Sequence, residues 1–184
     1  MMYYFFAASL PSVKFGEEPP MSVAEFDAAA GGEVVRREWE RLADFALPAA
    51  PGTAPETLLR VYREFCRFEV ELRTKIARRR ADRNGVLLEL PDPETLSPEV
   101  ESAVTAAAAA ASPAEREEIL DRARWAVLDE LESNHFFDLD YLCVYRLRLL
   151  LAARRERRRS VERGRANFEA ALDAVSAAAA GSAK

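Results

Sequence analysis

The hydrophobic positions of this chain recur mostly at three- and four-residue steps, the spacing of one face of an α-helix. One such run covers residues 56–83. Its apolar positions include Leu58, Tyr62, Phe65, Leu72 and Ile76. A second run covers residues 138–159, with Leu139, Leu142, Cys143, Leu149 and Leu150 on its apolar face. The pattern predicts two long amphipathic helices, of which the first spans about 42 Å at about 1.5 Å per residue.

Two short helices are predicted between the N-terminus and the first long run. Ser22 and Glu25 have the spacing of a capping box, in which each side chain bonds the backbone N–H of the other residue. The helix that they open is expected to end at Gly31-Gly32, because glycine commonly terminates helices. The next helix is expected over residues 33–45.

Two further helices are predicted between the long runs. Pro98 suits a first helical position and opens an alanine-rich helix that reaches about residue 111. Ser112, Pro113 and Glu115 combine an N-cap, a proline at the first position and a glutamate at the third. The helix that they open is expected to reach about Leu131.

The remaining segments are predicted to be loops or chain ends. Proline and glycine indicate loops at residues 11–21, 46–55 and 84–96. The aromatic residues within 1–10 favour a short buried extended segment, a strand more than a helix. Residues 160–179 either continue the second long helix or turn back, and residues 177–184 are expected to form a disordered tail. The expected fold is an all-α bundle of six to seven helices, with residues 1–176 as a single domain.

Composition agrees with an ordinary globular domain. The chain has 184 residues, of which 49% are hydrophobic, and a net charge of −5 that does not favour general polyanion binding. Cys66 and Cys143 are far apart and form no CxxC motif, so we expect free thiols in a reducing cytosol. The apolar N-terminus is shorter than the roughly 20 residues that span a bilayer. It also lacks the basic residue of a signal peptide, so we expect neither feature there.

No motif for catalysis or cofactor binding is present. The sequence contains no GxxxxGK[ST], GxGxxG or GxSxG pattern, and we expect a protein that is not an enzyme and has no cofactor. An unrecognised carboxylate site stays open as an alternative, because 31 acidic residues offer many chance pairs. The one histidine, His135, lies near Glu132, Asp138 and Asp140. One nitrogen ligand is fewer than most metal centres take, so we predict no metal site.

Two charged residues fall within apolar stripes of the long helices. Glu69 lies between Phe65 and Leu72, and Arg146 lies between Leu142 and Leu149. Because a buried charge is costly unless it is paired, we hypothesise a buried Glu69–Arg146 ion pair across two packed helices. In the alternative, each side chain reaches the rim of the core, and Glu69 bonds Arg73 one turn later.

Two arginine clusters lie near the ends of the long helices. The first consists of Arg78, Arg79, Arg80 and Arg83, and the second includes Arg154, Arg155, Arg158 and Arg159. Cations at these positions interact favourably with the helix macrodipole. Both clusters are also candidates for binding an anionic partner. Because the second has almost no aromatic residues for base stacking, nucleic acid is not expected.

Three stretches of the chain together resemble a known bacterial family. They are residues 3–11 (YYFFAASLP) with 19–26 (PPMSVAEF), residues 62–73 (YREFCRFEVELR) with 77–80 (ARRR), and residues 116–125 (REEILDRARW) with 136–142 (FFDLDYL) and 145–147 (YRL). In this order they resemble an uncharacterised family encoded beside V-type (A/V-type) ATPase genes. The opening stretch also looks like the start of the C-type (d-like) central-stalk protein of V-type ATPases, in a shortened form.

The resemblance implies an all-helical, non-catalytic protein that binds V-type ATPase subunits, in the central stalk or at the membrane rotor ring. It implies a cytoplasmic protein that meets the inner membrane only through the complex. The resemblance assigns no catalytic residue to this chain, because the C-type stalk protein has none and serves to join the rotor ring to the central shaft. The alternative is a helical adaptor that binds an anionic surface, nucleic acid or acidic protein, through its arginine-rich helix ends.

Overall fold

The computed structural model describes residues 3–43, 47, 59–88 and 98–181, and these residues form seven helices and no strand. The helices are α1 Tyr4–Ser9, α2 Val23–Glu33, α3 Arg36–Ala43, α4 Arg60–Arg83, α5 Pro98–Ala109, α6 Pro113–Glu132 and α7 Leu139–Gly181. The prediction of an all-α bundle with six to seven helices is confirmed. No helix in the described part of the chain combines the length and the apolar character needed to cross a membrane.

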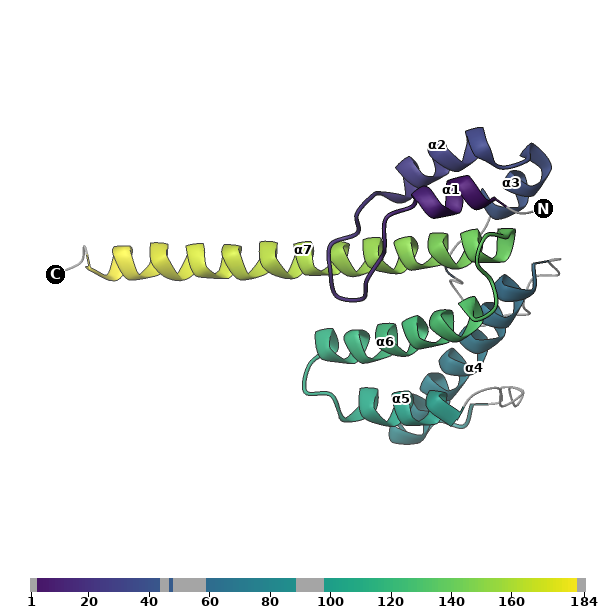
Figure 1. Cartoon of the computed structure of the whole chain (residues 1–184). Helices are drawn as coiled ribbons and strands as arrows, with labels where there is room; N and C mark the ends of the chain where they lie inside the picture. The colour runs from purple at the N-terminus through teal and green to yellow at the C-terminus, as the bar shows by residue number, and fades with distance from the viewer. Residues whose placement is uncertain (1–2, 44–46, 48–58, 89–97, 182–184) are drawn as a thin grey trace.

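The first half of α7 lies between two groups of helices (Figure 1). On one side are α1, α2 and α3, and on the other are α4, α5 and α6. Helix α7 packs directly against α2, α4 and α6. Its second half extends well beyond both groups as a single helix. The arrangement therefore consists of a compact bundle with one long projecting helix.

Apolar side chains from α4, α6 and α7 form the centre of the bundle. Phe65 and Leu72 of α4, Leu128 of α6, and Leu142 and Leu149 of α7 are almost completely buried in one hydrophobic cluster. These positions come from the stripes at three- and four-residue spacing that define each helix. The two predicted long helices thus pack as expected, through leucine and aromatic side chains.

A cluster of aromatic rings attaches α1, α2 and α3 to α7. The Phe26 ring is fully buried, with ring centroids 6.0 Å from Phe6, 6.3 Å from Trp39 and 5.3 Å from Tyr145. The Tyr145 hydroxyl donates a hydrogen bond of 2.8 Å to the carbonyl of Pro11. The first loop and the first three helices are therefore held to α7 mainly through aromatic packing.

The N-terminal segment is a helix, and its prediction as an extended segment was wrong. Residues Tyr4–Ser9 form α1, in which the Ala7 N–H donates to the Tyr3 carbonyl at 2.8 Å. Aromatic residues favour strands only where a neighbouring strand satisfies the backbone, and the described part of the chain contains none. A single helical turn satisfies these groups locally, while Phe6 and Ala7 still become buried.

The structure shifts the boundary between the second and third helices by three residues relative to the prediction, because α2 includes Glu33 and α3 begins at Arg36. Helix α2 passes through Gly31-Gly32 and ends at Glu33, where the Val34 N–H donates to the Ala30 carbonyl at 2.8 Å. Neither glycine has the positive φ that would terminate a helix. By contrast, Gly85 has a φ of 65° just after Asn84, the C-cap of α4, a conformation that glycine adopts without strain.

The second long helix continues rather than turning back. Helix α7 runs without a break to Gly181, so residues 160–179 extend it and residues 177–181 of the predicted tail are helical. Residues 11–21 form a loop as predicted. Most of the predicted loop 46–55, residues 89–96 of the loop 84–96, and residues 182–184 lie outside the described residues.

Candidate binding surfaces

The predicted Glu69–Arg146 ion pair does not form, because the two side chains face different helices. Glu69 of α4 is almost completely buried and bonds Arg124 of α6. It also accepts a hydrogen bond of 2.9 Å from Arg73, as the alternative interpretation expected. Arg146 instead donates two hydrogen bonds, of 2.9 and 3.1 Å, to the carboxylate of Asp27 in α2. The partner of each buried charge depends on the rotation of its helix about the helix axis and on which neighbouring helix it then faces. The apolar stripe alone specifies neither.

A buried ion-pair network joins α4, α6 and α7. At its centre the Asp121 side chain, only 2% exposed, accepts hydrogen bonds from Arg124 at 3.0 Å and from Arg154 and Arg158. Arg124 also bonds Glu69, so one continuous chain of charges connects three helices. The sequence interpretation missed Asp121 and Arg124. The available signal was that both occupy the face of α6 that also carries Leu120, Trp125 and Leu128.

The second arginine cluster is mostly occupied within the chain. Arg154 and Arg158 bond Asp121, and Arg155 donates two hydrogen bonds of 2.7 Å to Glu118. These guanidinium groups hold α7 against α6 and have their charge compensated there. Arg159 is exposed, at the start of the projecting part of α7. Internal pairing therefore accounts for Arg154, Arg155 and Arg158, which were predicted as possible partner-binding residues.

The Glu118–Arg155 pair leads to a prediction about the pH dependence of stability. The hydrogen bond from Arg155 lowers the pKa of Glu118 below its ordinary value of 4.5. A lowered pKa in the folded state means that ionised Glu118 stabilises the fold above pH 4.5, and that this contribution disappears as the pH falls through the lowered pKa. We expect Glu118→Gln to reduce the free energy of unfolding near neutral pH by about 0.5–1 kcal/mol, as for a partly exposed pair.

Urea denaturation of the wild type and Glu118→Gln across this pH range measures the difference. The difference in unfolding free energy should shrink steadily below pH 4.5. Glu130→Gln is a matched control, because Glu130 is exposed on the same helix. A difference between wild type and Glu118→Gln that stays constant at acid pH would contradict the prediction.

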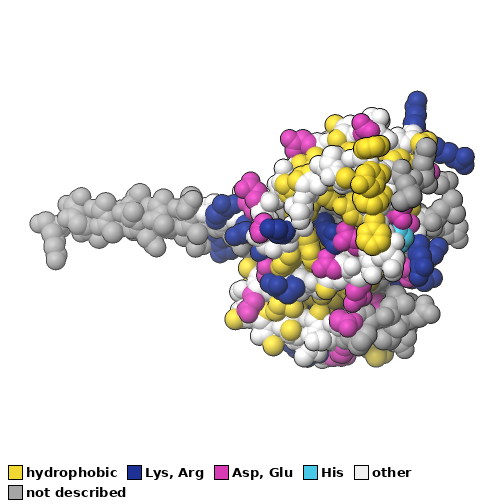
Figure 2. Space-filling model, viewed as in Figure 1, with side chains coloured by type: hydrophobic (Ala, Val, Ile, Leu, Met, Phe, Trp, Pro, Cys, Tyr) yellow, Lys and Arg dark blue, Asp and Glu magenta, His cyan; other side chains and the backbone are white. Residues whose placement is uncertain are grey.

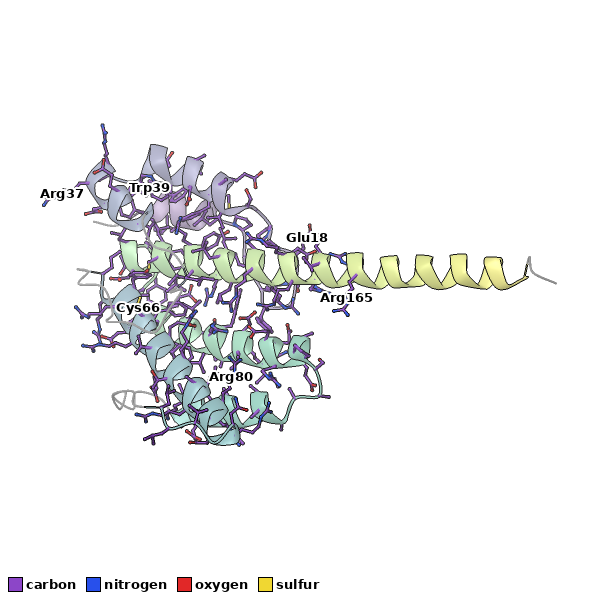
Figure 3. The ribbon with its side chains drawn as sticks, turned by 180° about the vertical axis from the view of Figure 1, so that it is seen from behind. Glu18, Arg37, Trp39, Cys66, Arg80 and Arg165 are labelled. Carbon is purple, nitrogen blue, oxygen red and sulfur yellow. The ribbon has the colours of Figure 1, made fainter. Side chains whose placement is uncertain are left out.

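The first arginine cluster borders a cavity of about 510 Å³ between α4, α5 and α6. Arg79, Arg80 and Arg83 line it from the end of α4, and Arg116 lines it from α6. Figure 3 shows Arg80 beside α5 and α6. Arg78, which was predicted with this cluster, is not among the lining residues. Arg79, Arg80 and Arg83 are close together in the sequence, whereas Arg116 joins them only because α6 packs beside α4.

An exposed aromatic patch lies where α1 meets the segment that leads into α7. It consists of Tyr4, Phe5 and Phe136, whose side chains are 55%, 87% and 67% exposed, together with the half-buried Phe137. The Tyr4 ring lies 4.6 Å from Phe137 and 5.6 Å from Phe5, measured between centroids. The backbone N–H of Tyr3 donates to the Phe137 carbonyl, which fixes the two segments together. Figure 2 shows hydrophobic side chains gathered on this face.

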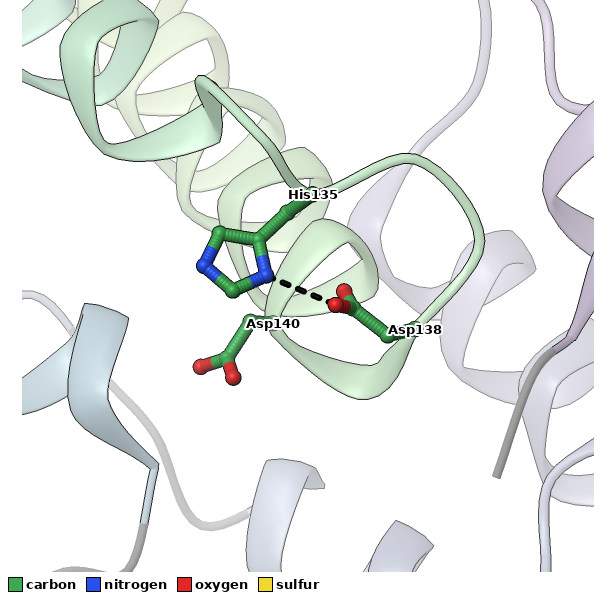
Figure 4. Close-up of side chains that lie close together, drawn as sticks. All are labelled: His135, Asp138 and Asp140. Carbon is green, nitrogen blue, oxygen red and sulfur yellow. Dashed lines mark hydrogen bonds and ion pairs between the residues drawn. The ribbon is translucent and has the colours of Figure 1, made fainter.

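His135, Asp138 and Asp140 form the one cluster of potential metal ligands found among the described residues (Figure 4). His135 Nδ1 lies 2.7 Å from Asp138 Oδ2. Each carboxylate also has a structural role. Asp138 Oδ1 accepts from the Tyr141 N–H at 2.8 Å and caps α7, and Asp140 Oδ1 accepts from the Val61 N–H at 3.2 Å and caps α4. Helix capping therefore accounts for the position of both acids, and the absence of a metal stays a prediction.

Comparisons with known proteins do not place the chain in a family. No family model matches the sequence, and no curated protein or solved structure matches it. The resemblance to proteins encoded with V-type ATPases therefore rests on the three stretches of sequence. Two of these stretches, residues 3–11 and 136–142, supply the aromatic patch.

Proposed function

We propose that this protein is a non-catalytic, V-type ATPase-associated protein that binds other ATPase subunits through its aromatic patch. Its role would be that of a C-like member of the central stalk or of an assembly factor that links subunits. The partners proposed are subunits of the central stalk or of the membrane rotor ring. The protein would then be cytoplasmic and would reach the inner membrane only through the complex.

One observation carries this proposal. Two stretches that underlie the resemblance lie more than 120 residues apart in the chain, yet they fold together into one exposed surface. Large apolar side chains at the surface weaken solubility and are typical of protein-binding sites, where aromatic residues often dominate the binding energy. Phe5 and Phe136 contribute little to the core, so packing within the chain does not explain their size or their exposure.

The shape of the molecule supports an interaction role rather than catalysis. The projecting half of α7 extends beyond the bundle, where it is available to a second protein (Figure 1). The alternative, an adaptor that uses both arginine-rich helix ends, has less support. Three arginines of the second cluster are already paired with Glu118 and Asp121.

The experiment is affinity purification of the tagged full-length chain from gently solubilised native membranes, with mass spectrometry of the proteins that co-purify. We expect V-type ATPase subunits with the wild type. The Phe5→Ser/Phe136→Ser variant should recover them about tenfold less or worse, because exposed aromatic anchors often contribute about 2 kcal/mol or more to binding.

A matched control removes two exposed apolar side chains elsewhere, at Leu87 and Val161. The Leu87→Ser/Val161→Ser variant should recover ATPase subunits as well as the wild type does. Circular dichroism should show that both double variants keep the helical fold. Failure to recover any ATPase subunits with the wild type would refute the association. Equal recovery with Phe5→Ser/Phe136→Ser would refute the role of the patch.

A further inference from the structure

The cavity between α4, α5 and α6 has an unusual concentration of positive charge. Among the described residues, its lining contains four arginines, Arg79, Arg80, Arg83 and Arg116, and no carboxylate. No ion pair connects any of these four arginines to an acid within the described part of the chain. The second cluster shows the opposite arrangement, since acids of α6 pair with its Arg154, Arg155 and Arg158.

Two of the four arginines are held in place by neutral groups. Arg79 Nη1 donates to the Thr105 hydroxyl at 3.2 Å, and Arg116 Nε donates to the Ala107 carbonyl at 3.0 Å. These bonds fix the side chains without cancelling their charge. Arg80 and Arg83 lie in the last turn of α4, where the helix macrodipole favours a cation. The macrodipole accounts for those two, but not for the convergence of Arg79 and Arg116 on the same cavity.

The rest of the cavity wall is apolar. Ile76, Val104 and Leu120 contribute hydrocarbon surface from three different helices. Ala107 and Ala108 also line the cavity, and their small side chains occupy little of its volume. A volume of about 510 Å³ lies within the range of about 300–1,000 Å³ typical of small-molecule sites. Such sites are mostly apolar and have a few polar groups that fix the orientation of the ligand, as here.

We infer that this cavity binds an aliphatic phosphate ester, with the phosphate at the arginines and the hydrocarbon chain against Ile76 and Leu120. Arginine forms paired hydrogen bonds with phosphate oxygens, and several arginines together match a doubly charged group. The apolar wall adds affinity for a chain that inorganic phosphate lacks. This inference does not depend on association with an ATPase.

The test is calorimetric titration of the full-length protein with decyl phosphate below its micelle concentration, and with inorganic phosphate in parallel. We expect one saturable site for decyl phosphate and affinity at least about tenfold weaker for inorganic phosphate, since burying several methylene groups is worth more than about 1.4 kcal/mol. No saturable binding of decyl phosphate would overturn the inference. Equal affinity for both ligands would also overturn it, because the apolar wall would then play no part.

Three variants test which residues form the site. Arg80→Gln and Arg83→Gln should each weaken decyl phosphate binding about tenfold, because each removes a charge-assisted bond to phosphate. Ala108→Trp should narrow the cavity and weaken decyl phosphate more than inorganic phosphate. Arg80, Arg83 and Ala108 are exposed, so these variants should fold normally. Arg159→Gln removes another exposed arginine, which is not among the residues that line the cavity, and should leave binding unchanged.

The phosphate ester can come from solution or from a membrane lipid, and vesicles distinguish these sources. Phosphatidylcholine vesicles that contain phosphatidic acid should bind the protein only if a lipid can enter the cavity, and Ala108→Trp should then weaken that binding. Binding to decyl phosphate alone assigns a soluble ligand. Vesicle binding without decyl phosphate binding would overturn the inference in favour of a purely surface attraction. Vesicle binding that Ala108→Trp leaves unchanged, beside saturable decyl phosphate binding, would assign the cavity a soluble ligand.

Discussion

Replacing Asp121 by alanine should lower the free energy of unfolding by about 3 kcal/mol, one of the largest effects expected from a single change in this protein. Removing one partner from a buried ion pair typically costs about 3–5 kcal/mol, because it leaves charge without compensation. The lower end applies here because Arg154 and Arg158 are each about one quarter exposed and can turn towards water. Arg124, by contrast, is buried and keeps only Glu69.

Urea denaturation followed by circular dichroism measures this change. Asp129→Ala is the matched control, because Asp129 of the same helix pairs with Arg148 at 2.6 Å but is more than half exposed. Its substitution should cost less than about 1 kcal/mol. If Asp121→Ala costs no more than Asp129→Ala does, the buried network does not stabilise the fold.

A double-mutant cycle tests whether the network acts as a unit. Arg124→Met alone removes a charge that bonds both Glu69 and Asp121. When it is combined with Asp121→Ala, the total loss should be smaller than the sum of the single losses by about 0.5–3 kcal/mol. This follows because each single variant removes a partner from the other residue of the Asp121–Arg124 pair, and this loss no longer exists when both residues are replaced.

Phe26→Ala should destabilise the protein by about 3–5 kcal/mol, the usual cost of removing a phenyl ring from a packed core. The Phe26 side chain is fully buried and contacts rings from α1, α3 and α7. The cavity left by its removal would lie where these elements meet. The loss should therefore loosen α1, α2 and α3 from α7 before it affects the packing of α4 against α6.

The two tryptophans make this local effect measurable. Trp39 lies beside Phe26, whereas Trp125 belongs to α6 and packs against Phe15. In a Trp125→Phe background, Phe26→Ala should shift the emission of Trp39 to longer wavelength at urea concentrations where the helix signal is still intact. Phe5→Ala makes the same chemical change at an exposed position and should have little effect. Coincident loss of both signals in Phe26→Ala would show that the bundle unfolds as one unit.

The helix starts could be predicted from sequence because capping chemistry is local. In α2, the Ser22 hydroxyl accepts from the Glu25 N–H at 3.2 Å, and the Glu25 carboxylate accepts from the Ser22 N–H at 2.7 Å. In α6, the Ser112 hydroxyl accepts from the Glu115 N–H at 3.1 Å. These bonds involve residues three positions apart, so the sequence alone contains everything that determines them.

The pairing of helices could not be predicted in the same way. An apolar stripe shows that Glu69 and Arg146 face the interior, but several helices border that interior. Their actual partners, Arg124 and Asp27, lie at distant positions with no local relation to them. The same limit applies to the cavity, because Arg116 joins Arg79, Arg80 and Arg83 only after α6 packs beside α4.

The hydrogen bond from the Val61 N–H to Asp140 makes the first turn of α4 depend on a residue 79 positions later in the chain. During synthesis, α4 emerges well before α7, so its start lacks this acceptor until most of the chain exists. An uncapped helix start leaves backbone N–H groups without partners inside the protein. The beginning of α4 therefore becomes complete only when α7 docks, so the first turn of α4 is expected to form its full set of hydrogen bonds late in folding.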